Sequence, residues 1–292
     1  MENDKRLLLV PVNFTEYSEN GAIYALNLAR YLDADIVLLN CYMEPVIAVP
    51  GILEPYSFSA STESFKVIEQ ETERSLKAFK NTLEKQKQKH HITDVAIKYD
   101  MVYGFPDNGI LTYAEQFDVD AIVMGFEKPE GFAKFGNITA NVIEKAKVPV
   151  IAIPQGYEAS VFKKPERVLY FTRVDDSDKE AIKRLSELVR FFNSKIICVH
   201  ACLGESSEEQ EHKMHEFKEF VVEYYAIENL ECGILETGDI IDGLIRFINK
   251  RNIDVLAMNT KKRNRLLKMF TTDFTEKLLY HTNVPLMVYH VD

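Results

Sequence analysis

The sequence lacks any apolar run that approaches the roughly 20 residues of a membrane-spanning helix. Its first residues, Met1 to Arg6, are too polar to form a signal peptide. The net charge is −10, and neither half of the chain has the basic excess of a nucleic-acid-binding protein. We therefore expect a cytoplasmic protein whose partners include neither a membrane nor a nucleic acid.

Cysteine is scarce, and its placement argues against a metal site. The four cysteines are scattered through mostly apolar runs, which favours reduced thiols in the core: Cys41, Cys198, Cys202 and Cys232. Cys198, His200 and Cys202 alternate as ligands on one strand could, but no second pair of ligands has the spacing of a zinc site. We predict no metal.

The motifs of nucleotide-processing enzymes are also missing. The sequence has no glycine–lysine phosphate loop, no Ser-Gly-Gly-x-Asp-Ser loop and no nucleophile elbow. His281 and His290 have no evident carboxylate or nucleophile partner in the sequence. We therefore predict no catalytic residue, and an enzyme of nucleotide chemistry is the least supported of the functions considered.

What the sequence does contain is a distinctive stretch from Asp118 to Pro154. The apolar run Ala121–Met124 ends at a glycine, as a buried parallel strand would. A loop follows, and Asn137 is predicted to cap a helix that leads to a second buried strand, Val148–Ile153. A helix N-terminus behind a strand presents free N–H groups and partial positive charge, where an anion such as a phosphate can bind.

The same unit occurs again near the other end of the chain. Asp254, Met258 and Pro285 repeat Asp120, Met124 and Pro149 in order, which indicates an internal duplication. The 292 residues are predicted to form two domains, 1–155 and 166–292, joined by a linker at 156–165. The first domain carries a proline-rich insertion at 43–60, which we interpret equally as a cover over its own core or as a partner-binding arm.

Strand and helix patterns alternate in both halves, which predicts a parallel α/β sheet with helices on both faces. The predicted strands of the first half are 6–12, 35–42, 95–102, 121–124 and 148–153, separated by helices at 16–32, 61–89, 105–117 and 138–146. The predicted strands of the second half are 167–171, 195–201, 230–235, 254–258 and 286–291, separated by helices at 177–192, 206–225, 239–250 and 273–281.

In these features the chain resembles the universal stress protein family in its tandem, two-domain form. The residues that carry the resemblance are Leu8–Asn13, Gly104-x-Pro106, Asp120–Gly125, Val148–Val150, Gly238–Asp239, Asp254–Met258 and Glu276–Pro285. The resemblance implies two tandem Rossmann-like domains, each a five-stranded parallel sheet in the order 3-2-1-4-5. It also implies an ATP or AMP site between strands 1 and 4, where ligands of such sheets bind.

The first half departs from the nucleotide-binding pattern of that family. Asn13 stands where an adenine-reading Asp is expected, and Lys128 replaces the second glycine of the phosphate loop. The loop is two residues short, and Glu127 adds negative charge. We predict a degenerate pocket with these nucleotide-binding residues: Val12, Asn13, Met124, Gly125, Gly136, Asn137, Ile138 and Thr139.

The second half departs further, and we expect no nucleotide there. Arg173 takes the Asp position, and Asn259 takes that of the first glycine. Asp273 places a carboxylate at the helix N-terminus, where a phosphate would bind. The basic loop 261–268 is interpreted as a solvated surface rather than as a docking patch for an anion.

The predicted function is that of a non-enzymatic protein of the stress response with a weakened nucleotide pocket. The alternative is a scaffold or sensor that has lost nucleotide binding and acts through protein partners or another small ligand. The resemblance also implies that the halves pair face to face through Val148–Ile153 and Leu286–Val291, as an intramolecular pseudo-dimer that covers both sheet edges. Whether two chains form a homodimer is left open by the sequence.

Overall fold

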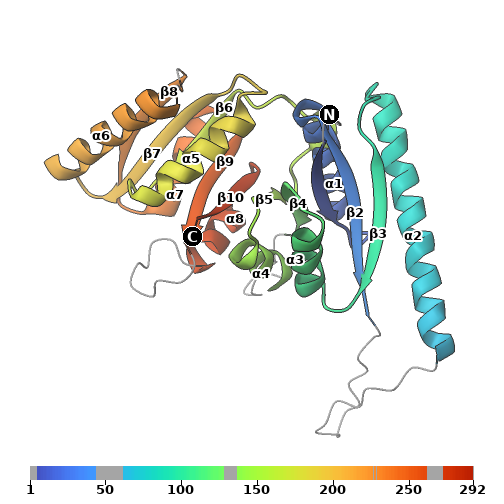
Figure 1. Cartoon of the computed structure of the whole chain (residues 1–292). Coiled ribbons are helices and arrows are strands. Elements are labelled where there is room, and N and C mark those ends of the chain that lie inside the picture. The colour runs from blue at the N-terminus through green and yellow to red at the C-terminus, as the bar shows by residue number, and fades with distance from the viewer. Residues whose placement is uncertain are drawn as a thin grey trace, which may run out of the picture.

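The computed structural model describes residues 5–43, 62–127, 137–225, 227, 229–261 and 272–291 (Figure 1). The elements of the first half are β1 (Arg6–Pro11), α1 (Glu16–Leu32), β2 (Ala34–Tyr42), α2 (Thr62–Lys89), β3 (Ile97–Tyr103), α3 (Pro106–Gln116), β4 (Ala121–Phe126), α4 (Asn137–Lys145) and β5 (Val150–Pro154). Strand and helix alternate as predicted. The proposed insertion lies outside the described residues, apart from Met43.

A short 3₁₀ helix, η1 (Ala159–Val161), connects this half to the second. The elements of the second half are β6 (Arg167–Phe171), α5 (Asp176–Val189), β7 (Lys195–Leu203), α6 (Glu208–Tyr225), β8 (Leu230–Thr237), α7 (Ile240–Arg251), β9 (Val255–Lys261), α8 (Thr272–His281) and β10 (Leu286–Val291). The order again matches the prediction, and most boundaries agree to within a few residues.

The ten strands form one continuous sheet in the order β3-β2-β1-β4-β5-β10-β9-β6-β7-β8. Each half therefore has the expected order 3-2-1-4-5, and neighbours within a half are parallel. The buried residues show that α1, α2, α5 and α6 cover one face, whereas α3, α4, α7 and α8 cover the other. In Figure 1, α2 lies along β3 at one end of the sheet and α6 lies beside β8 at the other.

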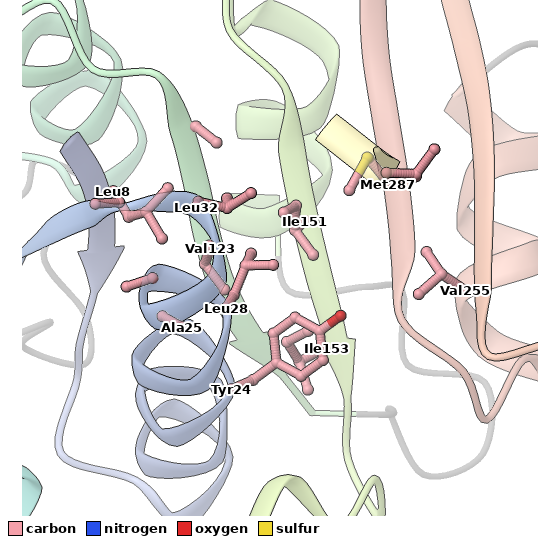
Figure 2. Packing of buried hydrophobic residues seen from close by; sticks show 14 of the residues in the cluster. Leu8, Tyr24, Ala25, Leu28, Leu32, Val123, Ile151, Ile153, Val255 and Met287 are labelled. Carbon is pink, nitrogen blue, oxygen red and sulfur yellow. The ribbon is translucent and has the colours of Figure 1, made fainter. Parts of the chain in front are cut away.

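The halves meet through the last strand of each, which are the strands expected to pair. The joint differs from the face-to-face arrangement, because β5 and β10 pair edge to edge and antiparallel, with Ile151 opposite Met287. Both side chains are buried in the same cluster, and Figure 2 shows them on adjacent strands. Edge pairing satisfies the backbone groups that two separate edge strands would leave free.

The local signals behind these elements are visible in α1. Thr15 caps the helix by accepting a hydrogen bond from the Ser18 N–H, as predicted. The apolar stripe that ends at Leu32 is buried, and Asp33 terminates the helix in the left-handed conformation. The sequence therefore determines where this helix begins, which face it buries and where it ends.

Several predicted helix starts differ from the structure by one or two residues, and α4 and α5 show the reason. Helix α4 includes Asn137, so the predicted cap lies inside the first turn. Helix α5 starts at Asp176 rather than Ser177 because Asp175 and Asp178 form a capping box there, and it ends at Val189 rather than Phe192. Short polar side chains in succession leave the position of a cap ambiguous until the backbone is known.

The connection between β5 and β6 is packed against the first half. Tyr24 of α1 makes edge-to-face contacts with Tyr157 and with Phe162. Asn20 accepts from the N–H of Ala159, which is buried. Among the described residues, no helix is long and apolar enough to cross a membrane.

Candidate functional site

A cavity of about 220 Å³ lies at the carboxyl ends of β1 and β4. The strand order of the half reverses between these two strands, and we call this position the switch point of the half. The lining of the cavity includes six of the eight residues predicted for the nucleotide pocket: Val12, Asn13, Met124, Gly125, Ile138 and Thr139. The other two are not placed there, because Gly136 lies outside the described residues and nothing is described of the Asn137 side chain. The parallel register of β1 with β4 brings the two segments together.

The end of β1 is held by β2 and by the start of α1. The Val12 N–H donates to the Leu39 carbonyl at 2.9 Å, and Asn40 Nδ2 donates to the Val12 carbonyl at 2.7 Å. Asn13 Nδ2 donates to the Tyr17 hydroxyl at 3.0 Å, and Asn13 Oδ1 accepts from the Thr15 hydroxyl at 2.5 Å. The amide of Asn13 is therefore already engaged at the N-terminus of α1.

The end of β4 lies against α1 so closely that only glycine fits. A Cβ atom on Gly125 would be 1.7 Å from the Tyr17 carbonyl oxygen, and one on Gly21 would be 2.4 Å from the Gly125 nitrogen. Such distances are far below van der Waals contact, so both glycines are required by the packing of helix on strand. Gly125 thus has a structural reason to be glycine, whether or not a ligand binds.

The rest of the lining is mostly apolar and includes residues that sequence reasoning missed. These residues come from β2, α3 and the end of β4: Leu39, Cys41, Pro106, Ile110 and Phe126. Burial raises the pKa of the Cys41 thiol to about 11, and Asp107 adds to that shift. Cys41 is therefore a neutral wall of the cavity at physiological pH.

Among the described residues that line the cavity, the only charged side chain is negative. Glu127 lines the cavity, and lysine and arginine are absent from its described lining. Asp107 of α3 lies near Cys41 of β2 and accepts a hydrogen bond from Asn141 of α4 at 3.0 Å. Among the described residues, attraction for a phosphate would come from the N-terminus of α4, where Ile138 and Thr139 lie. The cavity thus suits a flat, largely apolar group better than a polyanion.

In the second half, the corresponding position is filled by the protein itself. Arg173 follows β6 as Asn13 follows β1, and its guanidinium donates to Asn259 Oδ1 at 3.2 Å and to the Ser177 hydroxyl at 3.1 Å. Asn259 is fully buried and donates to the same hydroxyl at 2.9 Å. These three side chains join the ends of β6 and β9 to the first turn of α5.

A buried carboxylate extends this network. Asp178 accepts from the Tyr170 hydroxyl at 2.7 Å and from the N–H groups of Arg173 and Asp175 at 3.0 Å each. Burial raises the pKa of Asp178, an effect that these hydrogen bonds oppose. Arg173 Nε also contacts Asp175 at 3.3 Å. Among the described residues, the position of this half that corresponds to the cavity is therefore a hydrogen-bonded polar cluster.

The remaining predicted features fall at other places in the fold. The basic loop lies outside the described residues except for Lys261, the last residue of β9. His200 Nδ1 lies 3.1 Å from the Thr172 carbonyl oxygen, and the cysteines are free. Within the part of the chain that the structure describes, no three histidine, cysteine or acidic residues gather as metal ligands would.

Comparisons with known proteins agree with this architecture. The model of the universal stress protein family matches the chain twice, over residues 6–154 and 165–290. Universal stress protein MJ0531 of Methanocaldococcus jannaschii is 27% identical over 154 residues, which are 52% of this chain and 84% of that protein.

Two solved structures share the whole fold. A universal stress protein from Archaeoglobus fulgidus superposes with a TM-score of 0.73 at 17% identity, covering 98% of this chain and 99% of that one. A putative universal stress protein from Pseudomonas aeruginosa has a TM-score of 0.60 at 14% identity, covering 98% and 94%. At these identities the likeness is one of fold, and the two family matches carry the assignment. The chain belongs to the universal stress protein family, with one copy of the family's domain in each half.

Proposed function

We propose that this chain is a non-enzymatic protein of the stress response whose first half binds an adenine nucleotide, ATP or AMP, weakly, and whose second half binds none. The observation that carries this proposal is the contrast between the two switch points. One encloses an apolar cavity of about 220 Å³, whereas the guanidinium of Arg173 occupies the other.

The cavity fits a purine base better than it fits a triphosphate. Its volume is below the roughly 300–1,000 Å³ of typical ligand pockets, which limits the enclosed group to a base with part of its sugar. Leu39, Ile110 and Met124 offer apolar contact to the ring faces. The N-terminus of α4 would favour a phosphate, while Glu127 would oppose it, so we expect weak binding.

The second half lacks the space and the charge balance for the same ligand. A nucleotide there would have to displace Arg173 from Asn259 and Ser177, which would leave the buried Asn259 Oδ1 without its Arg173 donor. An unsatisfied buried amide costs roughly 1–3 kcal/mol, which would further reduce the affinity of any ligand at this position.

We also propose that the halves act as two domains, 1–155 and 166–292 with the linker 156–165, forming an intramolecular pseudo-dimer. The antiparallel pairing of β5 with β10 supports this view, because it relates the halves by an approximate twofold arrangement of strands.

Calorimetry on the full-length chain tests the pocket. Titration with ATP or AMP should give a dissociation constant on the order of 0.1 mM. Ile138 is partly exposed at the cavity, so Ile138→Trp should obstruct it and weaken binding at least about tenfold. Lys145→Trp adds the same ring on the exposed side of α4 and should bind like the wild type. No binding heat at millimolar nucleotide, or equal binding by both variants, would remove the pocket from the proposal.

The alternative, a scaffold or sensor without nucleotide binding, is favoured by one observation. Gly125 is explained by the Tyr17 carbonyl alone, so its presence is not a sign of phosphate binding. Under this alternative the wild type would show no heat with either nucleotide, and it would act through protein partners or through another small ligand in the same apolar cavity.

A further inference from the structure

Two of the four cysteines lie directly opposite each other on neighbouring strands. Cys198 of β7 and Cys232 of β8 are paired in the parallel register, and both side chains pack on the face covered by α6. Neighbouring strands lie about 4.8 Å apart. This separation falls within the roughly 4.4–6.8 Å between Cα atoms that a disulfide spans. The two thiols are close enough that each shifts the pKa of the other.

The two thiols differ in their access to solvent. Cys198 is fully buried, whereas Cys232 is only partly buried and lies on the edge strand of the sheet. Cys232 lines a groove of about 480 Å³ between α6 and β8, together with Met214, His215 and Lys218. A small oxidant can therefore reach Cys232 from the groove, but it cannot reach Cys198 first.

The charges around the pair also distinguish the two thiols. Hydrogen bonding with Cys198 and the ammonium of Lys218 lower the pKa of Cys232, although burial and the carboxylate of Glu231 oppose that shift. Burial raises the pKa of Cys198 well above its ordinary value, and Asp178 adds to it. The accessible thiol is thus the better nucleophile, and the buried one keeps its proton.

We propose that Cys232 and Cys198 form an oxidisable dithiol site that reacts with hydrogen peroxide and closes into a disulfide between β7 and β8. The Cys232 thiolate attacks a peroxide oxygen, the O–O bond breaks, and the departing hydroxide takes up a proton to leave as water. The sulfur of Cys198 then attacks the Cys232 sulfenic acid. The S–O bond breaks, and hydroxide leaves with the Cys198 proton as a second water.

The balance of this reaction is two thiols and one hydrogen peroxide giving one disulfide and two waters, and a thiol reductant reverses it. The bond would attach the edge strand β8 covalently to β7. Gly233, next to Cys232, has no side chain, and a Cβ placed there would meet no atom within 4 Å, which eases the small adjustment of the edge strand that a cross-strand disulfide needs. The site lies in the second half and does not depend on the nucleotide pocket of the first.

Peptide mapping of the full-length chain tests the site directly. After treatment with equimolar hydrogen peroxide we expect the loss of two of the four thiols and a single linked peptide that joins residues 198 and 232, reversed by dithiothreitol. Cys202→Ala removes a buried thiol of the same strand, opposite Glu236, and should leave this result unchanged. Oxidation confined to Cys41 or Cys202, or linkage only between chains, would overturn the proposal.

The order of events is tested with two further variants. Cys198→Ala should stop at a sulfenic acid on Cys232 that a dione probe traps, whereas Cys232→Ala should leave Cys198 reduced. Lys218→Gln should slow oxidation of the folded protein roughly two- to tenfold by reducing the thiolate fraction of Cys232. Lys213→Gln, whose lysine pairs with Glu209 on the same helix, is the matched control and should not change the rate. Equal rates for both lysine variants, or a reactive Cys198 in the Cys232→Ala protein, would contradict the assigned roles.

Discussion

At the scale of single residues, glycine is required by packing at one position and not at another. Gly125, near the end of β4, takes the position at which the resemblance to the family implies a glycine for the approach of a phosphate. In this structure the Tyr17 carbonyl oxygen already occupies the space beside its Cα. Gly238, before α7, also matches the family pattern, yet it has open space around it and no positive φ. Packing therefore determines how much free energy of unfolding is lost when a side chain is added at each glycine.

We expect Gly125→Ala to reduce the free energy of unfolding by at least about 3 kcal/mol, because its Cβ would lie 1.7 Å from a backbone oxygen that cannot rotate away. Gly238→Ala is the matched control and should change stability by no more than about 0.5 kcal/mol. Urea denaturation followed by circular dichroism measures both. Equal stability of the two variants would show that β4 and α1 can separate without cost.

At the scale of elements, a network of ion pairs attaches the edge strand β8 to its neighbours. Glu231 of β8 receives Lys195 Nζ of β7 at 2.7 Å and the guanidinium of Arg251 at the end of α7. These contacts lower the pKa of Glu231 below its ordinary value of 4.5, the hydrogen bond from Lys195 contributing most. All three side chains are more than one third exposed, so solvent screens much of the attraction.

Glu231→Gln should therefore lower the free energy of unfolding by about 0.5–1 kcal/mol at pH 7. Because the folded pKa is depressed, the stabilisation is present above the unfolded pKa near 4.5 and is lost as the pH falls through the folded pKa. The difference between wild type and variant should shrink on acidification below that value. Denaturation curves at pH 7 and below pH 4.5, each at low and high salt, measure this difference in stability. A difference that grows in acid would refute the assigned pKa direction.

At the scale of the whole molecule, the two halves share a sheet and a core. Ile151 of β5 and Met287 of β10 are opposite each other across the only antiparallel pairing among the described strands. Both lie in a buried cluster that includes residues from both halves. Figure 2 shows Ile153 on β5, the strand of Ile151, while Val255 belongs to β9, the neighbour of β10. Apolar contact across the joint means that loosening one half exposes part of the other.

We expect Ile151→Ala and Met287→Ala each to cost about 2–5 kcal/mol, and the double variant to cost less than their sum by at least about 0.5 kcal/mol, because the two side chains share one contact. Ile151→Ala combined with Ile248→Ala, on the opposite face of the sheet, should be additive within about 0.5 kcal/mol. Chemical denaturation of the four proteins in each cycle measures the coupling. Additivity in both cycles would mean that the halves are energetically independent.

Much of the fold could be read from the sequence, because the relevant signals are local. Buried strands such as Arg167–Phe171 are short continuous apolar runs, and Thr15 caps its helix through a contact three residues away. Of the candidate site, the residues at the ends of β1 and β4 were predicted because a repeated motif marks them. The wall contributed by Leu39, Cys41 and Ile110 was not, since these residues approach the site only through the packing of β2 and α3.

The sequence by itself determined the duplication, the alternation of strands and helices, and the departures from a nucleotide-binding motif. Each of these rests on motifs of a few consecutive residues, which in the duplication occur twice. Only the tertiary structure decided that Arg173 inserts between Asn259 and Ser177, that Cys198 faces Cys232, and that the halves join edge to edge. These contacts depend on strand register and on helix packing between distant segments, where the free energy of burial and hydrogen bonding selects one arrangement among many that local patterns permit.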